Sequence, residues 1–117
     1  MAKIFCLLNN KNKNIQQRVE ESLNYNPGWQ KRFFQSEGIL LGCFELPFKH
    51  ESDFWREDED FVIAIDGEIM SWNGEVKGNS PAEKLLNMFK KKGDGLVNVV
   101  NGTFSIIIWD KKNRIFF

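Results

Sequence analysis

Short apolar runs, separated by polar stretches, divide the chain into segments of strand length. The runs Lys3–Leu8, apolar after Lys3, and Phe61–Ile65 are too short for core helices, so we expect a buried strand at each. Gly67, which follows the second run, permits a tight turn or a close backbone approach. The same pattern predicts strands at 29–35 and 39–46, joined at 36–38, and a hairpin of 103–109 and 114–117 around 110–113. The carboxylate-rich stretch 47–60 is predicted to be a solvated loop.

The segment that follows Asn14 has the spacing of an amphipathic helix. Ile15, Val19 and Leu23 recur every four residues, and Asn14 can serve as the N-cap. Pro27-Gly28 lies beyond this segment and is typical of the end of a helix.

The clearest local signal in the chain lies at Ser80-Pro81-Ala-Glu83. Ser80 fits an N-cap, Pro81 the first helical position, and Glu83 closes a capping box. We therefore predict a helix that begins here and ends at Gly93, with the lysines of 90–92 opposing the helix macrodipole in the last turn.

Taken in order, the elements are a strand, a helix, two or three strands, a helix, a short helical turn over 96–100 and a hairpin. Strands outnumber helices, and the helices are long enough to cover sheet faces. This order predicts an α+β fold with mostly antiparallel sheets and covering helices. At 117 residues the chain is expected to form one domain, residues 1–117, around a single core.

Composition and charge exclude several classes of partner. Sixteen basic and sixteen acidic side chains leave no net charge to attract nucleic acid or a membrane surface. No apolar run approaches the roughly 18 residues of a membrane span, and the start of the chain lacks the pattern of a secretory signal. We therefore expect a cytoplasmic protein without nucleic-acid or membrane partners.

The cysteines and the histidine offer little chemistry of their own. Cys6 and Cys43 lie in apolar runs without metal-ligand spacing, so reduced thiols without zinc or another bound metal are expected. His50 is the only histidine, and no clear orienting partner accompanies it for a nucleophilic triad. We interpret it as a solvated loop residue.

Two stretches together resemble a known family. IAIDGEI, followed by SPAEKLLNMFKKKGDGLVNVVNGTFSIIIWDKKNRIFF, resembles the amino-terminal glutaminase domain of the asparagine synthetase family, a class II glutamine amidotransferase. In that family a strand ending in Asn-Gly-Glu-Ile precedes a Ser-Asp-x-Glu helix start, and a Leu-x-Gly-x-Phe-Ala-Phe-x-Ile-Trp-Asp strand follows. The resemblance implies an N-terminal-nucleophile (Ntn) hydrolase fold, here a partial αββα sandwich. The family's later strands and its ATP-using synthetase domain are expected to be missing from this chain.

The resemblance places a vestigial catalytic site at three positions. Ala2 stands where the family has its cysteine nucleophile, whose freed α-amino group acts as general base. Asp66 stands where an asparagine side chain donates to the oxyanion, and Gly67 keeps the place of the second donor. We therefore expect no catalytic residue in this chain, and we treat Gly67 and Glu68 as candidates for residual glutamine binding.

Other positions fit the family less well. Cys6 is a candidate for a replacement nucleophile, but it lies about 13 Å along a strand from Ala2. Pro81 replaces the helix-start aspartate that holds the glutamine α-amino group, and Arg32 cannot be matched to the family's Arg-Gly-Pro-Asp motif. Asn101-Gly102 and Trp109-Asp110 are interpreted as turn and packing elements.

Three functions stay open at this point. The chain is expected to be a degenerate glutaminase-like domain that serves as scaffold for an ATP-dependent, amide-forming synthetase, as in the β-lactam synthetase and lasso-peptide cyclase branch that has also lost the cysteine. Alternatively, it is a free-standing interaction module completed by a partner or by a second copy of itself, or an active glutamine amidotransferase. The expected partners are a synthetase domain or a second copy. No cofactor is expected in this chain, because ATP and Mg²⁺ would belong to the synthetase domain.

Overall fold

The computed structural model describes residues 2–8, 14–22, 28–45 and 54–117. Within these ranges the elements are β1 (Ala2–Leu8), α1 (Ile15–Ser22), β2 (Gln30–Ser36), β3 (Ile39–Glu45), β4 (Trp55–Glu57), β5 (Phe61–Trp72), α2 (Pro81–Lys92), the 3-10 helix η1 (Gly93–Asn98), β6 (Val100–Asp110) and β7 (Ile115–Phe116). The strands form two antiparallel sheets, ordered β1-β3-β2 and β4-β5-β6-β7. The predicted α+β class with mostly antiparallel sheets is therefore confirmed.

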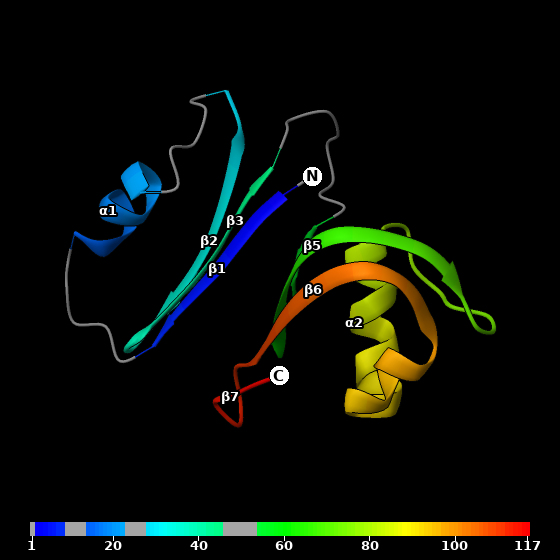
Figure 1. Cartoon of the computed structure of the whole chain (residues 1–117). Helices are drawn as coiled ribbons and strands as arrows, with labels where there is room; N and C mark the ends of the chain where they lie inside the picture. The colour runs from blue at the N-terminus through cyan, green and yellow to red at the C-terminus, as the bar shows by residue number, and fades with distance from the viewer. Residues whose placement is uncertain (1, 9–13, 23–27, 46–53) are drawn as a thin grey trace.

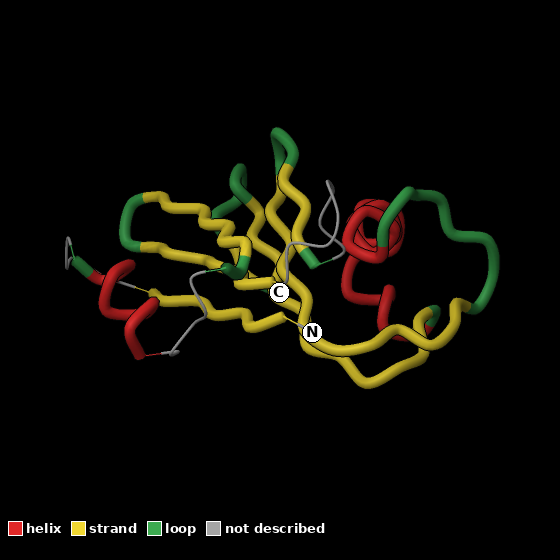
Figure 2. The backbone as a smooth tube through the Cα atoms, turned by 90° about the horizontal axis from the view of Figure 1, so that it is seen from above, coloured by secondary structure: helices red, strands yellow, loops and turns green. Residues whose placement is uncertain are grey.

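The helices lie on the outer sides of the two sheets. Figure 1 shows α1 beyond the three-stranded sheet and α2 against the long β5–β6 ribbon. Seen from above in Figure 2, the ribbon curves past α2, which lies along one of its faces. No helix among the described residues is long and apolar enough to cross a membrane.

Two clusters of buried side chains fill the spaces between these layers. One lies between the sheets and joins β3 to β5 and β6, through Ile39, Leu41, Cys43, Val62, Ala64 and Trp109. The other lies between the four-stranded sheet and α2, through Ile63, Ile65, Leu85, Leu86, Phe89 and Ile108. Alternate residues of β5 therefore belong to different clusters, as the period of two in a strand requires.

The sequence signals for α2 are confirmed in detail. The Glu83 N–H donates to Ser80 Oγ over 3.1 Å, and Pro81 is the first helical residue. The Glu83 carboxylate accepts a hydrogen bond from the N–H of Asn79 over 3.2 Å. A capping box usually uses the N–H of the N-cap residue, here Ser80, which is the next residue along the chain. Gly93 ends the helix, as expected.

The predicted end of the strand at Ile65 is wrong. β5 continues to Trp72, and the pairing with β6 runs unbroken through Asp66 and Gly67. Gly67 has a φ of 116°, and a Cβ there would collide with the carbonyl oxygen of Thr103. Glycine therefore permits a close approach of two strands rather than a turn.

The opposite strand has the same feature two residue pairs further along, at Gly102. A Cβ on Gly102 would collide with the carbonyl oxygen of Glu68 and would lie 3.0 Å from Ile69 Cα. Asn101-Gly102 is thus part of β6 and not a turn, which corrects the sequence interpretation. Asn101 instead donates from its side chain to Ser71 Oγ and Asn73 Oδ1, both over 3.2 Å.

The described end of the carboxylate-rich stretch, residues 54–60, is more structured than predicted, and residues 47–53 lie outside the described residues. Trp55–Glu57 pairs with β5, and the Trp55 side chain is buried between the sheets. Glu57 accepts from Lys111 over 2.8 Å, and Asp58 forms an ion pair with Lys90 of α2. These carboxylates therefore join neighbouring elements instead of being only solvated.

The predicted hairpin is present between β6 and β7. Asp110 accepts from the N–H groups of Lys112 and Asn113, both over 3.0 Å, and from the side chain of Asn113 over 2.8 Å. These bonds, led by those from Asn113, lower the pKa of Asp110. Arg114, at a φ of 55°, donates to the carbonyl oxygen of Glu37 over 3.0 Å, so the hairpin turn contacts the β2–β3 turn.

Candidate functional site

A pocket of about 510 Å³ opens at the Asp66-Gly67-Glu68 stretch of β5. Its other lining residues are Phe54, before β4, and Thr103 on β6. Thr103 is paired directly with Glu68 across the ribbon, and the two side chains therefore share one face. The residues that the sequence analysis selected thus line a cavity.

The pocket lies at the margin of the space between the sheets. Val62 and Ala64 face the three-stranded sheet, and the alternation of the strand places Asp66 and Glu68 on the same side. Along this face of β5, the apolar residues of the inter-sheet core are therefore followed by the two carboxylates that line the pocket. In the described part of the pocket wall the lining side chains are a phenyl ring, two carboxylates and a hydroxyl group, without a thiol, an imidazole or an amine.

Cys43 on β3 is buried in the inter-sheet core. Burial raises the pKa of the Cys43 thiol to about 12, with a smaller contribution from Glu45. Asp66 also raises this pKa, whereas Arg32 lowers it, so all three charged groups act on one thiol. Arg32 is paired with Cys43 across the three-stranded sheet, and Glu45 lies two residues further along β3, so two of these groups are close neighbours of the thiol.

An ion pair joins two strands of the three-stranded sheet beside Cys43. Arg32 Nε donates to Glu45 Oε1 over 3.3 Å, from β2 to β3. The Glu45 side chain is only 4% exposed, against 28% for Arg32. Because a carboxylate this buried needs a partner, Arg32 has a structural task in this protein.

Cys6 lies against the inter-sheet core and not in the lining of the Asp66 pocket. Its thiol packs against the inter-sheet core, and burial raises its pKa. A nucleophilic cysteine needs the opposite, a thiolate stabilised near neutral pH. Both cysteines are free, which agrees with the expectation of reduced thiols, although Cys6 is only half-buried.

Ala2 and Pro81 lie where the sequence placed them, on β1 and at the start of α2. Ala2 is paired with Glu45, and Cys43 is paired with Ile4. The start of β1 therefore lies beside Cys43 and Glu45 of β3. His50 lies outside the described residues.

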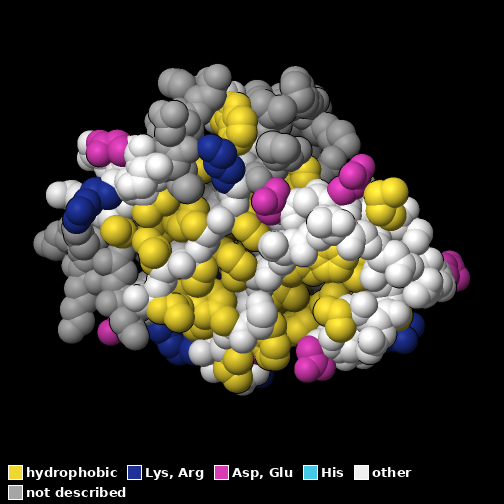
Figure 3. Space-filling model, viewed as in Figure 1, with side chains coloured by type: hydrophobic (Ala, Val, Ile, Leu, Met, Phe, Trp, Pro, Cys, Tyr) yellow, Lys and Arg dark blue, Asp and Glu magenta, His cyan; other side chains and the backbone are white. Residues whose placement is uncertain are grey.

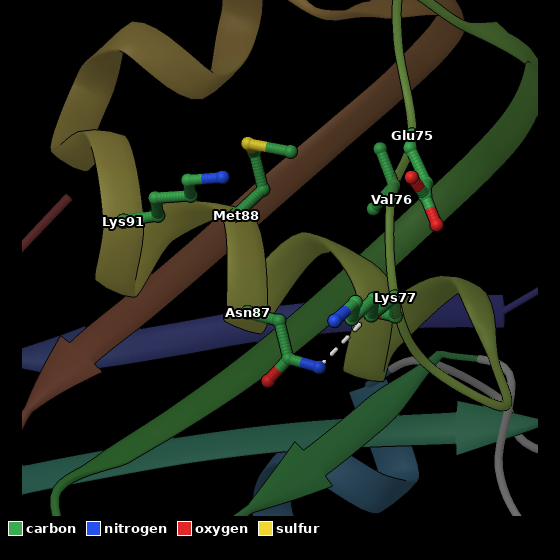
Figure 4. A pocket seen from close by; sticks show the side chains of 6 residues that line it. All are labelled: Glu75, Val76, Lys77, Asn87, Met88 and Lys91. Atoms are coloured by element: carbon green, nitrogen blue, oxygen red, sulfur yellow. Dashed lines mark hydrogen bonds between the residues drawn. The ribbon is translucent and has the colours of Figure 1, made fainter.

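A second cavity, of about 490 Å³, lies between α2 and the segment 75–77 and is lined by different kinds of side chain. Figure 4 shows the segment 75–77 crossing the helix, where Asn87 Nδ2 donates to the carbonyl oxygen of Lys77 over 3.0 Å. The charged groups here are the exposed side chains of Glu75, Lys77 and Lys91. The cavity is therefore bounded by α2 and by a connecting segment that is hydrogen-bonded to it. It shares no lining residue with the Asp66 pocket.

No group of three or more candidate metal ligands gathers among the residues that the structure describes. Ionised carboxylates accept hydrogen bonds and attract cations, and they cannot donate to a developing oxyanion.

Comparisons with known proteins point to one family. No family model matches the chain. Asparagine synthetase [glutamine-hydrolyzing] 2 of Bacillus subtilis (strain 168) is 35% identical over 75 residues, which cover 56% of this chain and 10% of that protein. A probable asparagine synthetase of Dictyostelium discoideum is 26% identical over 107 residues, or 77% of this chain and 19% of that protein. The chain is similar to asparagine synthetases.

A third asparagine synthetase, from Sandersonia aurantiaca, is 22% identical over 78 residues, covering 60% of this chain and 15% of that enzyme. The chain thus spans a tenth to a fifth of the length of these curated asparagine synthetases. The comparisons support the asparagine-synthetase resemblance at the level of the family.

The residues that sequence reasoning missed are Phe54, Thr103 and Glu45. Thr103 was seen only as the start of a strand, and its pairing with Glu68 follows from the continuation of β5 through Gly67. Glu45 lies at the end of an apolar run, where a lone glutamate is the only signal of a buried charge. No local signal marked Phe54.

Proposed function

We propose that this chain is a glutaminase-like domain of an asparagine-synthetase-family protein that has lost glutamine hydrolysis. In this proposal it keeps an Ntn-hydrolase-like arrangement and serves as scaffold for an ATP-dependent, amide-forming synthetase. The adenylating chemistry would lie in another domain or polypeptide. The similarity to asparagine synthetases and the order of helix, two sheets and helix in Figure 1 support this proposal.

One observation carries the proposal, namely Asp66 in the wall of the pocket. The family resemblance puts an asparagine here, whose amide N–H stabilises the oxyanion of acyl transfer. A single donor of this kind contributes on the order of 3 kcal/mol to the transition state. A carboxylate at this position removes that donor and repels the developing negative charge.

The thiols support the same conclusion. Ala2 has no thiol at the position of the family's nucleophile, and both existing cysteines have raised pKa values. A thiol with a pKa of about 12 is almost entirely protonated near pH 7. Oxyanion donor and nucleophile are therefore both lacking, whereas Gly67 and Glu68 keep the shape of the pocket.

The direct test is incubation of the chain with glutamine, followed by measurement of ammonia and glutamate. We expect no release above that of a buffer control. Hydrolysis that disappears in Cys6→Ala would overturn the proposal, because it would identify a working nucleophile in the chain.

A gain-of-function pair tests whether the architecture persists. Ala2→Cys supplies the nucleophile after removal of Met1, and Asp66→Asn supplies the donor. We expect slow glutamine hydrolysis from the double variant, and at least tenfold less from either single variant, because the two groups act in one step. Ala2→Cys with Glu68→Gln is the matched control, since it removes a carboxylate of the same pocket without supplying the oxyanion donor. An inactive but folded double variant would count against a glutaminase-like site.

The scaffold role has its own test. A polypeptide or adjoining region with a Ser-Gly-Gly-x-Asp-Ser pyrophosphate loop is the expected partner, and the two should copurify. An active amide-forming synthetase that neither binds this chain nor changes its rate when the chain is added would contradict this part of the proposal alone.

A further inference from the structure

The segment 73–79 joins β5 to α2 and is held in place near both of its ends. Near its start, the N–H of Asn73 donates to the carbonyl oxygen of Val99 over 2.7 Å. Near its end, the carbonyl oxygen of Lys77 accepts a hydrogen bond from Asn87 Nδ2 of α2 over 3.0 Å. The fold itself therefore positions the segment beside the helix and forms the space between them, as is usual for small-molecule sites.

The cavity of about 490 Å³ between this segment and α2 has an apolar part and a cationic part. Its volume is within the range of about 300–1,000 Å³ that is common for small-molecule sites. Val76 and the buried Met88 supply the apolar part. Lys77 and Lys91 supply the cations. In Figure 4 the side chain of Lys91 extends from the helix toward the segment, whereas that of Lys77 extends back toward the helix.

The two lysines of the cavity are not neutralised by any carboxylate of the described residues. Neither Lys77 nor Lys91 takes part in an ion pair within this part of the chain. Lys90, on the same helix, is by contrast paired with Asp58. Glu75 also lines the cavity and is paired with neither lysine, so two positive charges and one negative charge face this space. This balance favours a ligand with one anionic group.

The types of the charged residues favour a phosphate over a carboxylate. Lysine acts on a phosphate as a compact point charge, whereas the planar fork of arginine is the better match for a carboxylate. No arginine is among the described residues that line the cavity. A phosphate monoester carries close to two negative charges and has three acceptor oxygens, so it can accept from two ammonium groups at once. The carboxylate of Glu75 would repel a second phosphate group.

The apolar part of the cavity favours an organic body attached to the phosphate. The thioether of Met88 is a good contact for the edge of an aromatic ring, and Val76 offers further apolar surface. An inorganic phosphate ion would leave both side chains uncovered. The cavity therefore matches an ester better than a free ion.

An anion should be attracted by these two lysines and not by the surface as a whole. The chain has no net charge. On the face drawn in Figure 3, the Lys and Arg side chains are scattered among other side chains. A lysine outside the cavity should therefore contribute little to binding, because exposed charges are screened by salt over about 10 Å.

We propose that the cavity between α2 and the segment 75–77 binds a small organic phosphate monoester. The phosphate oxygens accept hydrogen bonds from Nζ of Lys77 and of Lys91, and the organic body packs against Val76 and Met88. Every residue that lines the cavity lies between positions 75 and 91, and none of them lines the Asp66 pocket. This inference is therefore independent of the proposed loss of glutaminase activity, and failure of either proposal leaves the other intact.

Phenyl phosphate is the probe that tests the inference on the 117-residue chain. Its binding is compared with that of inorganic phosphate and of benzoate by NMR titration at pH 8 and constant ionic strength. We expect phenyl phosphate to shift the signals of the Lys77 amide and the Met88 methyl group. It should bind at least fivefold more tightly than inorganic phosphate, which lacks the apolar body, and than benzoate, which has a single charge.

Three lysine variants provide the matched control. Lys77→Gln and Lys91→Gln should each weaken the binding of phenyl phosphate at least threefold. Lys92→Gln removes the same charge from the same helical turn, outside the cavity, and should change the affinity less than twofold. All three side chains are exposed, so we expect the variants to fold normally.

Four outcomes would overturn the inference. The first is that phenyl phosphate shifts neither the Lys77 nor the Met88 signal. The second and third are that inorganic phosphate or benzoate binds as tightly as phenyl phosphate, since the site would then recognise only an anion or a carboxylate. The fourth is that Lys92→Gln weakens binding as much as Lys77→Gln and Lys91→Gln, because the attraction would then belong to the surface and not to the cavity.

Discussion

The two faces of β5 differ in what they contact, although they belong to one strand. On the face toward α2, Ile63 and Ile65 pack into an unbroken apolar layer. On the face toward the other sheet, buried Val62 and Ala64 are followed by Asp66, where the pocket begins.

The difference shows how a rigid strand can carry an open site. The α2 face fixes the position of the backbone, and the inter-sheet face is free to vary once the core has ended. Residues of β5 up to Ile65 should therefore determine stability, and Asp66 and the residues after it should determine what the pocket binds.

The largest effect should come from the α2 face. Ile63→Ala removes a fully buried side chain and should lower the free energy of unfolding by about 3 kcal/mol, the usual scale for such a cavity. Urea denaturation measures this loss. Met70→Ala on the same strand, with its side chain 71% exposed, should change stability by less than about 0.5 kcal/mol. Similar losses of stability in Ile63→Ala and Met70→Ala would contradict the claim that the first part of β5 determines stability.

A smaller loss is expected at the point where the two parts of β5 meet. Gly67→Ala combines a φ of 116° with a Cβ that would lie 2.6 Å from Phe104 Cα, so it should cost about 2 kcal/mol or more. Gly74→Ala has a similar backbone, with a φ of 100°, but nothing lies within 4 Å of its Cβ. Thermal unfolding should therefore show the smaller loss in Gly74→Ala, and equal losses would exclude the close approach as the cause.

The contact of α2 with the β4–β5 turn should depend on pH. Burial opposes ionisation of Asp58, but hydrogen bonds from Lys90 and from the N–H groups of Phe61 and Asp60 outweigh it, so the pKa of Asp58 is lowered. A lowered carboxyl pKa stabilises the fold above the unfolded value of about 3.9, and this stability is lost as pH falls through the folded value.

Asp58→Asn should therefore lower stability by about 1 kcal/mol at pH 7 and by progressively less as the pH falls below 4. Chemical denaturation across that range measures the difference. Glu59→Gln, at an exposed neighbouring position, should follow the wild-type curve. A loss in Asp58→Asn that stays constant down to pH 3 would show that the charge is not responsible.

The smallest effect concerns the inter-sheet face. In a Cys6→Ser background, Asp66→Asn should raise the alkylation rate of Cys43 at fixed alkaline pH, because Asp66 raises the pKa of that thiol. A change of about twofold corresponds to about 0.4 kcal/mol, the scale of a charge interaction screened by water. Glu68→Gln should leave the rate unchanged. An unchanged rate in Asp66→Asn would place its carboxylate away from the inter-sheet space.

Local signals predicted those parts of the fold that local physics determines. Ser80, Pro81 and Glu83 mark the start of α2 because a helix cap is made by residues within one turn. The class of the fold and the Asp66-Gly67-Glu68 stretch were likewise accessible from the sequence.

The other features depend on contacts between distant residues. The sequence left open a tight turn or a close backbone approach at Gly67, because a glycine after an apolar run has the same local signature in both cases. The ion pair of Arg32 with Glu45 joins residues that only strand pairing brings together. The strand β4 was missed because it is only three residues long and lies in a polar stretch. No periodicity extends over so short a segment.

Gly67 and Gly102 also bear on how freely the sequence can vary. Each lets a carbonyl oxygen of the opposite strand come close, so neither position accepts another side chain without moving the ribbon. The positions beside them, Asp66 and Glu68, point into an open pocket and carry no such restriction. An exchange of amide for carboxylate at position 66 can therefore alter the chemistry of the pocket in a single mutational step, while the bend that shapes it is inherited unchanged.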